Sequence, residues 1–201
     1  MYPGEVPRLA LAALIAFSAA NAWASQSARC VDGLTVNAAS VRHLTFRINL
    51  GNLRIVGGKD NSIRMRCEPT SETVDNRVIL YYSGDAPSAT LALTGARLSK
   101  QQIRVEVPAR LNLIVRVKAG EVTIHGVEGS KDVKVAAGGI LIEIPQPTAY
   151  ASVDATVRVG GLKAPLFRAA QSGLLCSFRR THAQGKYNLL AFVGAGQIRL
   201  E

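Results

Sequence analysis

Apolar and polar residues alternate along most of the chain after residue 40. Leu44, Phe46 and Ile48 alternate with polar residues, and Val115 and Val117 continue the same pattern further along. Alternation with a period of two is typical of β-strands that bury one face. No stretch of comparable length carries an apolar stripe at helical spacing. The pattern therefore predicts an all-β protein.

The alternating segments are interrupted by glycine at matching points. The segments are KAGEVTI at 118–124, AAGGILI at 136–142, RVGGLKA at 158–164 and GAGQIRL at 194–200. Their aligned glycines, Gly120, Gly138, Gly160 and Gly196, are separated by 18, 22 and 36 residues, and 36 is two units of 18. Such a period is typical of stacked repeats, and glycine adopts the positive φ that a corner needs.

We therefore expect a single-domain parallel β-solenoid (β-helix) with coils of about 18–22 residues that stack in chain order. A meandering antiparallel sandwich would show the same alternation, but it would not so readily place glycine corners in phase. Residues 25–201 form this domain, with an irregular leader at 25–40. The segments 68–88 and 164–186 break the repeat, and the second is a candidate flap over apolar groups such as Leu141.

The first 24 residues have the features of a secretory signal peptide. Arg8 precedes an apolar stretch, Leu9 to Ala20, and Ala22-Trp23-Ala24 matches an A-x-A cleavage site. A membrane anchor is the alternative, but the stretch is shorter than the roughly 20 residues that span a bilayer. The sequence predicts export to the periplasm or the cell surface.

The formal net charge of +10 indicates anionic partners or a requirement for solubility. For an exported chain, nucleic acid is not an expected partner, whereas anionic glycans and lipid headgroups are. Four cations, Arg116, Lys118, Lys134 and Arg158, fall on outward positions of strands that enter the glycine corners. We expect them to cluster and to bind an anionic polymer. The alternative is that they serve only solubility and the protection of a β surface.

Three cysteines, Cys30, Cys67 and Cys176, allow one disulfide in an oxidising compartment and leave one thiol over. A Cys30–Cys67 bridge is one possibility, and Cys67 as a small buried apolar residue is another. The cysteines lack the spacing of a metal site, and the three histidines are isolated in sequence. We expect no metal and no cofactor.

Two carboxylates, Asp132 and Asp154, fall at the same phase of two repeats and are expected to face outwards. Stacked carboxylates on a β-helix could serve a carbohydrate-active enzyme. A solvated surface pair near Lys131 and Lys134 is the alternative. No nucleophile elbow, zinc-protease, Walker or Rossmann motif accompanies them.

An ordered series of short motifs covers roughly residues 40–201. It comprises Val107-Pro108, Gly120-Glu121-Val122, Val127-Glu128-Gly129, Gly139-Ile140 and Gly194-Ala195-Gly196-Gln197-Ile198. In this order they resemble a bacterial family named for "putative adhesin" proteins with β-strand repeats, mostly of unknown function. Gly139 departs from the family pattern, in which an acidic residue is common. The resemblance implies a β-helix and supplies no catalytic residues.

The leading hypothesis is an exported, non-enzymatic binding, adhesin-like or scaffold module at the cell envelope. One alternative is an enzyme that uses Asp132 and Asp154. Another is a structural protein that self-associates through the solenoid ends, because the chain ends in a strand-like run at Glu201 without a polar cap.

Overall fold

The computed structural model describes residues 24–69, 77–95 and 101–201. The expected signal peptide lies outside these residues, except for Ala24. The strands are β1 (Ala24–Arg29), β2 (Leu34–Asn37), β3 (His43–Leu50), β4 (Asn52–Gly58), β5 (Ser62–Pro69), β6 (Ile79–Asp85), β7 (Ser88–Thr94), β8 (Gln101–Pro108), β9 (Asn112–His125), β10 (Lys131–Ile142), β11 (Tyr150–Ala164), β12 (Ala169–Thr181) and β13 (Tyr187–Leu200). The described chain also contains two single turns of 3₁₀ helix, η2 (Pro147–Ala149) and η3 (Pro165–Phe167). The all-β prediction is confirmed.

The strands form one sheet of mixed orientation rather than the purely parallel arrangement expected from the repeat. Its main path runs β1-β6-β7-β3-β9-β10-β13-β11-β12, and β2, β5, β8 and β4 branch from it through β9. Short connections join β6 to β7 and β11 to β12, and both pairs are antiparallel, as a direct reversal of the chain requires. The segment from β3 through β9, β10 and β13 to β11 is parallel.

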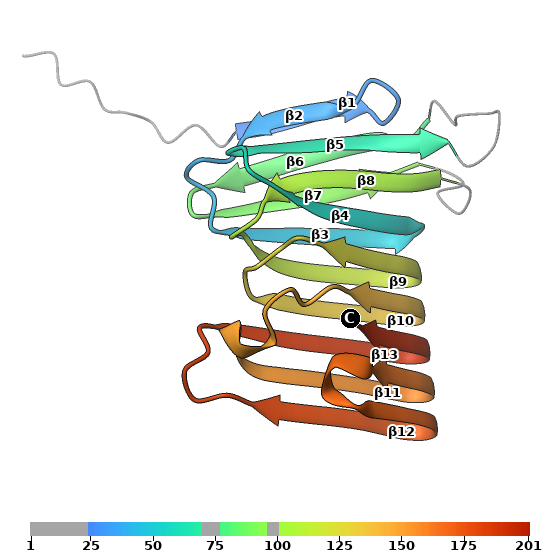
Figure 1. Cartoon of the computed structure of the whole chain (residues 1–201). Coiled ribbons are helices and arrows are strands. Elements are labelled where there is room, and N and C mark those ends of the chain that lie inside the picture. The colour runs from blue at the N-terminus through green and yellow to red at the C-terminus, as the bar shows by residue number, and fades with distance from the viewer. Residues whose placement is uncertain (1–23, 70–76, 96–100) are drawn as a thin grey trace, which may run out of the picture.

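The long strands β9 to β13 bend in the middle, so that each contributes to two faces (Figure 1). We call the half before the bend the first face and the half after it the second face. The bends stack because the corner glycines are register partners: Gly120 pairs with Gly138, Gly138 with Gly196, and Gly196 with Gly160. A Cβ added to Gly138 would lie 1.9 Å from the carbonyl oxygen of Gly120. Its φ of 133° also lies outside the usual range of L residues.

The stacking order differs from the expected chain order. The last strand, β13, lies between β10 and β11 (Figure 1), so the 36-residue interval does not represent two successive coils. The segment 164–186 is not a flap over Leu141. It forms η3 and the edge strand β12, which pairs with β11 and is three strands away from the Leu141 strand. The last strand, β13, therefore lies within the stack of strands, and β12 is the edge strand at that end of the sheet.

The core lies between the two faces and consists of aliphatic ladders. On the first face Val115, Val133, Ala191 and Ala155 are buried register partners, and on the second face Ile124, Ile142 and Leu200 are. Burial of one such Val or Ile side chain contributes about 1.5–3 kcal/mol. Alternation along each strand then leaves every second side chain on the outside, where the candidate functional residues lie.

Among the described residues, no helix has the length and apolar character that crossing a membrane requires.

Candidate anion-binding face

The outward residues of the first face form rows that cross the strands. One row contains Arg47 on β3, Arg116 on β9 and Lys134 on β10, which are register partners. Neighbouring strands lie about 4.8 Å apart, so three cations follow one another in a line of about 10 Å. The alternation predicted that each points outwards, and the pairing of β3 with β9 brings Arg47 into the row.

These side chains surround a groove of about 390 Å³. Its polar lining comprises Arg47, Asn49, Arg116, Lys118 and Lys134, and its apolar lining includes Phe192. Phe192 on β13 follows Lys134 in the same row, so a half-buried aromatic ring closes the groove on that side. Positive charge around an apolar floor suits a ligand that carries anionic groups on a partly apolar backbone.

Arg116 is held in place by its neighbours. Its Nη2 contacts Oδ2 of Asp132, and its Nη1 donates to the carbonyl oxygens of Asp132 at 2.8 Å and Val115 at 3.0 Å. The guanidinium is therefore fixed across β9 and β10, and its charge is compensated by a carboxylate.

The other three groove cations are not compensated. Arg47, Lys118 and Lys134 are exposed, and none of them makes an ion pair with any residue that the structure describes. Asp132 is the single carboxylate among the outward residues of the first-face halves of β3, β9 and β10, all of which are described. The groove therefore carries a net positive charge that its own side chains do not neutralise.

Arg158 does not belong to this cluster, contrary to expectation. It lies on β11, and β13 separates β11 from β10. Gly194 of β13 lies between Arg158 and the strand that carries Lys134. Arg158 is exposed and has no ion pair within the described chain.

Sequence reasoning placed Arg47 on an outward position but not in the site, and it missed Phe192. Both omissions have one cause. The contacts join β3 to β9 across the intervening strands β4 to β8, and β10 to β13 across β11 and β12. Alternation shows which way a residue faces, but it does not show which distant strand lies beside it.

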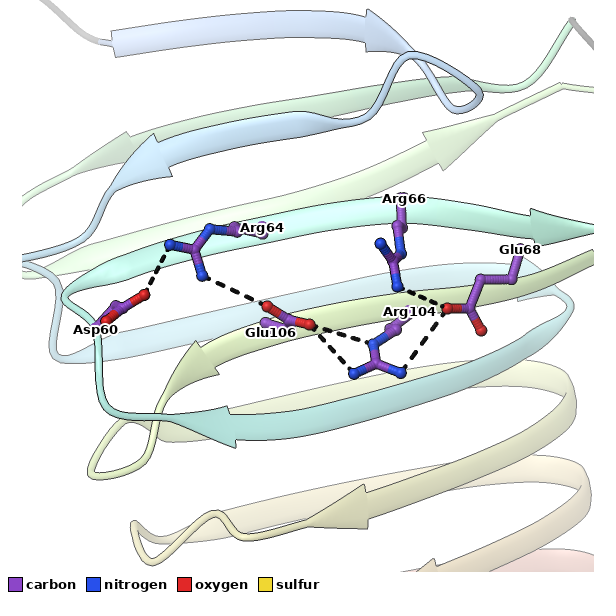
Figure 2. A network of polar contacts seen from close by, with 6 residues as sticks. All are labelled: Asp60, Arg64, Arg66, Glu68, Arg104 and Glu106. Atoms are coloured by element: carbon purple, nitrogen blue, oxygen red, sulfur yellow. Dashed lines mark hydrogen bonds and ion pairs between the residues drawn. The ribbon is translucent and has the colours of Figure 1, made fainter.

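A second charged surface, on β5 and β8, is organised differently. It comprises Asp60, Arg64, Arg66, Glu68, Arg104 and Glu106 (Figure 2). Arg64 binds Asp60 at 2.7 Å and lies 3.5 Å from Glu106, and Arg104 binds Glu106 at 3.2 Å. Arg66 binds Glu68 at 3.1 Å. Three arginines and three carboxylates thus neutralise one another, and the hydrogen bond and charge of Asp60 raise the pKa of Arg64.

Asp132 and Asp154 share a phase, as expected, but they are not on adjacent strands. Both are register partners of Leu190 on β13, one from each side. Asp132 contacts Arg116, and Asp154 accepts a hydrogen bond from Nε of Arg179 at 2.8 Å. Arg116 lies on β9 and Arg179 on β12, and these strands lie on opposite sides of β13. The two carboxylates therefore pair with arginines in opposite directions across the sheet. Nothing in this arrangement favours their joint action on a glycosidic bond.

A lysine is buried at the start of β10. Lys131 does not lie at the surface near Asp132, contrary to the expectation from the sequence: it precedes Val133 by two positions and shares its inward direction, and only 2% of its surface is exposed. Its Nζ donates to the carbonyl oxygen of Gly129 at 2.9 Å, contacts the Tyr150 hydroxyl and lies 4.8 Å from the Tyr150 ring centroid. Burial lowers the pKa of Lys131 to about 7, against the opposing effect of the Glu128 charge, and burial raises the pKa of Tyr150.

Cys30 and Cys67 form a disulfide with Cα atoms 5.2 Å apart, and Cys176 is free and buried. The bridge ties the end of β1 to β5, at the opposite end of the sheet from β12. Within the described ranges, no group of three or more His, Cys, Asp or Glu side chains could hold a metal ion.

No protein-family model matches the chain, and no curated protein does either. One similar solved structure bears the description "putative cell adhesion protein" and comes from Clostridium sporogenes ATCC 15579. It is 10% identical, covers 89% of this chain and 100% of its own, and has a TM-score of 0.45. A likeness this distant carries no argument about fold or function.

Proposed function

We propose that this chain is a non-enzymatic binding module of the cell envelope, and that its β3–β9–β10 groove binds a linear anionic polymer. The observation that carries the proposal is the set of uncompensated cations Arg47, Lys118 and Lys134 around the groove. On β5 and β8, by contrast, Arg64, Arg66 and Arg104 meet carboxylates. A surface that needed charge only for solubility has no reason to exclude carboxylates from one groove.

The spacing of the cations supports an extended ligand. Arg47, Arg116 and Lys134 follow one another at the strand interval of about 4.8 Å, so successive anionic groups of a chain can each meet a cation. In this proposal the parallel strands act as a β-solenoid scaffold, and they hold the cations at that interval because the backbone ladder fixes it. An anionic glycan of the envelope has this chemistry.

A charge-matched comparison tests the groove. The variant Arg47→Gln/Lys118→Gln/Lys134→Gln removes three uncompensated charges, and the control Arg64→Gln/Arg66→Gln/Arg104→Gln removes three compensated ones. Binding to a sulfated polysaccharide, measured by titration at several salt concentrations, should fall at least about tenfold in the groove variant. That corresponds to a loss of about 1.4 kcal/mol. Its salt dependence should flatten, because ionic attraction is screened over about 8 Å at physiological strength.

The control should bind within about threefold of the wild type, a difference below 1 kcal/mol. Equal losses in the two variants would mean that net charge alone drives binding, and the groove would then have no specific role. Arg158→Gln should leave polymer binding unchanged, because β13 separates Arg158 from the groove.

Export is a separate part of the proposal. A mature N-terminus at Ser25, found by mass spectrometry of the envelope fraction, is the expected result. An intact Met1 species in the cytoplasm would contradict it.

A further inference from the structure

We infer that the bent edge of the stack docks on the surface of a membrane that contains anionic lipids. This edge is distinct from the groove floor. It is formed by the last residue of β3, by the residues that directly precede the corner glycines of β9, β10, β13 and β11, and by their partner on β12.

These residues are register partners and form a continuous line, which we call the corner ridge: Leu50, Ala119, Ala137, Ala195, Val159 and Leu174. All six are apolar. The line crosses six strands, so it is about 24 Å long at the usual strand spacing. The stacked bends along which it runs are visible at one side of Figure 1.

The three most exposed large apolar side chains of the described chain lie on the ridge or directly beside it. Leu174 is 77% exposed, its neighbour Leu175 74% and Val159 51%, and Leu50 at the other end is 42% exposed. Isolated exposed apolar residues are ordinary, but a contiguous group of them marks an interaction surface.

Leu175 adds an independent observation. Its φ of 54° lies in the left-handed region, which a leucine adopts only with strain. Asn or Gly would occupy this conformation more readily, and no contact in the core accounts for a side chain that is mostly exposed. A strained and exposed leucine at the tip of a ridge is explained by a contact made outside the molecule.

Charges beside the ridge indicate what that contact is. Lys118 and Arg158 directly precede Ala119 and Val159, and neither makes an ion pair within the described chain. Just beyond the corner glycines, the exposed neighbours include Gln197 and one carboxylate, Glu121. Apolar tips flanked by cations are the combination that holds proteins in the headgroup region of anionic bilayers.

The shape of the ridge favours a lipid surface over a second copy of the chain. The ridge is convex, because it follows the outside of a bend, and two convex ridges share little contact area. A bilayer surface accommodates a convex apolar edge along its whole length. Arg158, which lies outside the groove, has a place in this contact.

Co-sedimentation with vesicles tests the inference. The wild type should bind vesicles of phosphatidylcholine mixed with phosphatidylglycerol, and it should bind pure phosphatidylcholine far less. Leu174→Ser/Leu175→Ser should lower binding to the mixed vesicles at least about tenfold, since two exposed leucines lose their burial in lipid. The control Leu166→Ser/Leu190→Ser removes two exposed leucines away from the ridge and should bind within about twofold of the wild type.

Arg158→Gln should weaken vesicle binding and leave the titration with soluble sulfated polysaccharide unchanged. The leucine variant should likewise bind the polysaccharide normally, which also shows that it is folded. If the wild type does not bind the mixed vesicles, or if the ridge and control variants bind them equally, the inference is wrong. The proposal that the groove binds an anionic polymer would not be affected. A wild-type dimer that dissociates in the Leu174→Ser/Leu175→Ser variant would assign the ridge to self-association instead.

Discussion

The sheet carries two charged surfaces over one core, and they differ in how their charges are arranged. On β5 and β8 each arginine meets a carboxylate, and the six residues of Figure 2 sum to no net charge. On β3, β9 and β10 the cations are about as dense, but Asp132 is the single carboxylate of the corresponding strand halves. Both surfaces arise from the same alternation of apolar and polar residues. Residue type and direction therefore do not determine whether a surface is neutral; the identity of the cross-strand neighbour does.

The cations of both surfaces lie outside a common core, and the largest expected effect tests this arrangement. Val135 is fully buried, whereas Lys134 beside it is exposed. Val135→Asp places an unpaired carboxylate among aliphatic side chains and should lower the free energy of unfolding by at least about 3 kcal/mol. Lys134→Asp should lower it by less than about 1 kcal/mol. Chemical denaturation measures both, and equal effects would mean that the register of β10 is displaced by one residue.

The second prediction concerns Lys131, the cation that alternation places inside. Its folded pKa of about 7 lies below its ordinary value of 10.5, because burial disfavours the charged amine. Between these two values the unfolded chain binds more protons than the folded one, so stability should rise with pH across this interval. Below pH 7 the amine is charged in both states, and the full cost of burying the charge is present.

Lys131→Met provides the measurement. The difference in unfolding free energy between the wild type and this variant should change in favour of the wild type by about 1–3 kcal/mol from pH 7 to pH 10. Urea denaturation at several pH values determines it. A difference that is constant with pH would show that Lys131 titrates in the folded protein much as it does in the unfolded chain.

The sequence allowed the local parts of this structure to be predicted and the distant parts only in outline. Alternation correctly predicted that Val135 is buried and Lys134 exposed, and the glycines at matching positions of the repeat predicted the stacked bends. The position of β13 was not predictable from the repeat. Gly196 fits equally well beside Gly138 and Gly160, and the structure uses both contacts. Because every long strand carries the same glycine register, any of them can pair beside any other. The order of the strands in the sheet is therefore decided by which strand edges remain unpaired once the connections have formed.

The candidate site shows the same limit. Three of its four predicted residues, Arg116, Lys118 and Lys134, lie together because β9 and β10 are neighbours in sequence and in space. Arg158 was misplaced because β13 enters between β10 and β11. Arg47 joins the groove through a contact between β3 and β9. Whether a cation is compensated was not predictable either, because Arg66 and Lys134 follow the same alternation and differ in their neighbours.

The third prediction concerns substitutions that remove the difference in charge pairing between the two surfaces. Glu68→Gln/Glu106→Gln leaves Arg66 and Arg104 without their carboxylates on an exposed sheet. If uncompensated cations bind the polymer, affinity for a sulfated polysaccharide should increase by up to about 30-fold at low salt, since each of the two released charges contributes about 1 kcal/mol near an anionic surface.

Glu121→Gln/Asp85→Asn is the matched control. It changes the net charge equally, but neither exposed carboxylate is paired within the described chain. The control should change affinity by less than about twofold, which is below 0.5 kcal/mol. Equal gains in the two variants would show that the pairing in Figure 2 has no bearing on binding.

The smallest effect is expected beside the groove, at the carboxylate that pairs with Arg116. Asp132→Asn removes the charge that compensates Arg116 and leaves the two backbone hydrogen bonds of Arg116 in place. Polymer affinity should rise by less than about threefold, because Arg116 is half-buried and gains freedom to reach the ligand only in part. Asp154→Asn removes an equivalent charge next to Arg179, on the far side of β13. It should leave affinity unchanged in the same titration, because the groove ends at Phe192. An equal gain from the two substitutions would extend the binding surface across β13 to β11 and would return Arg158 to the site.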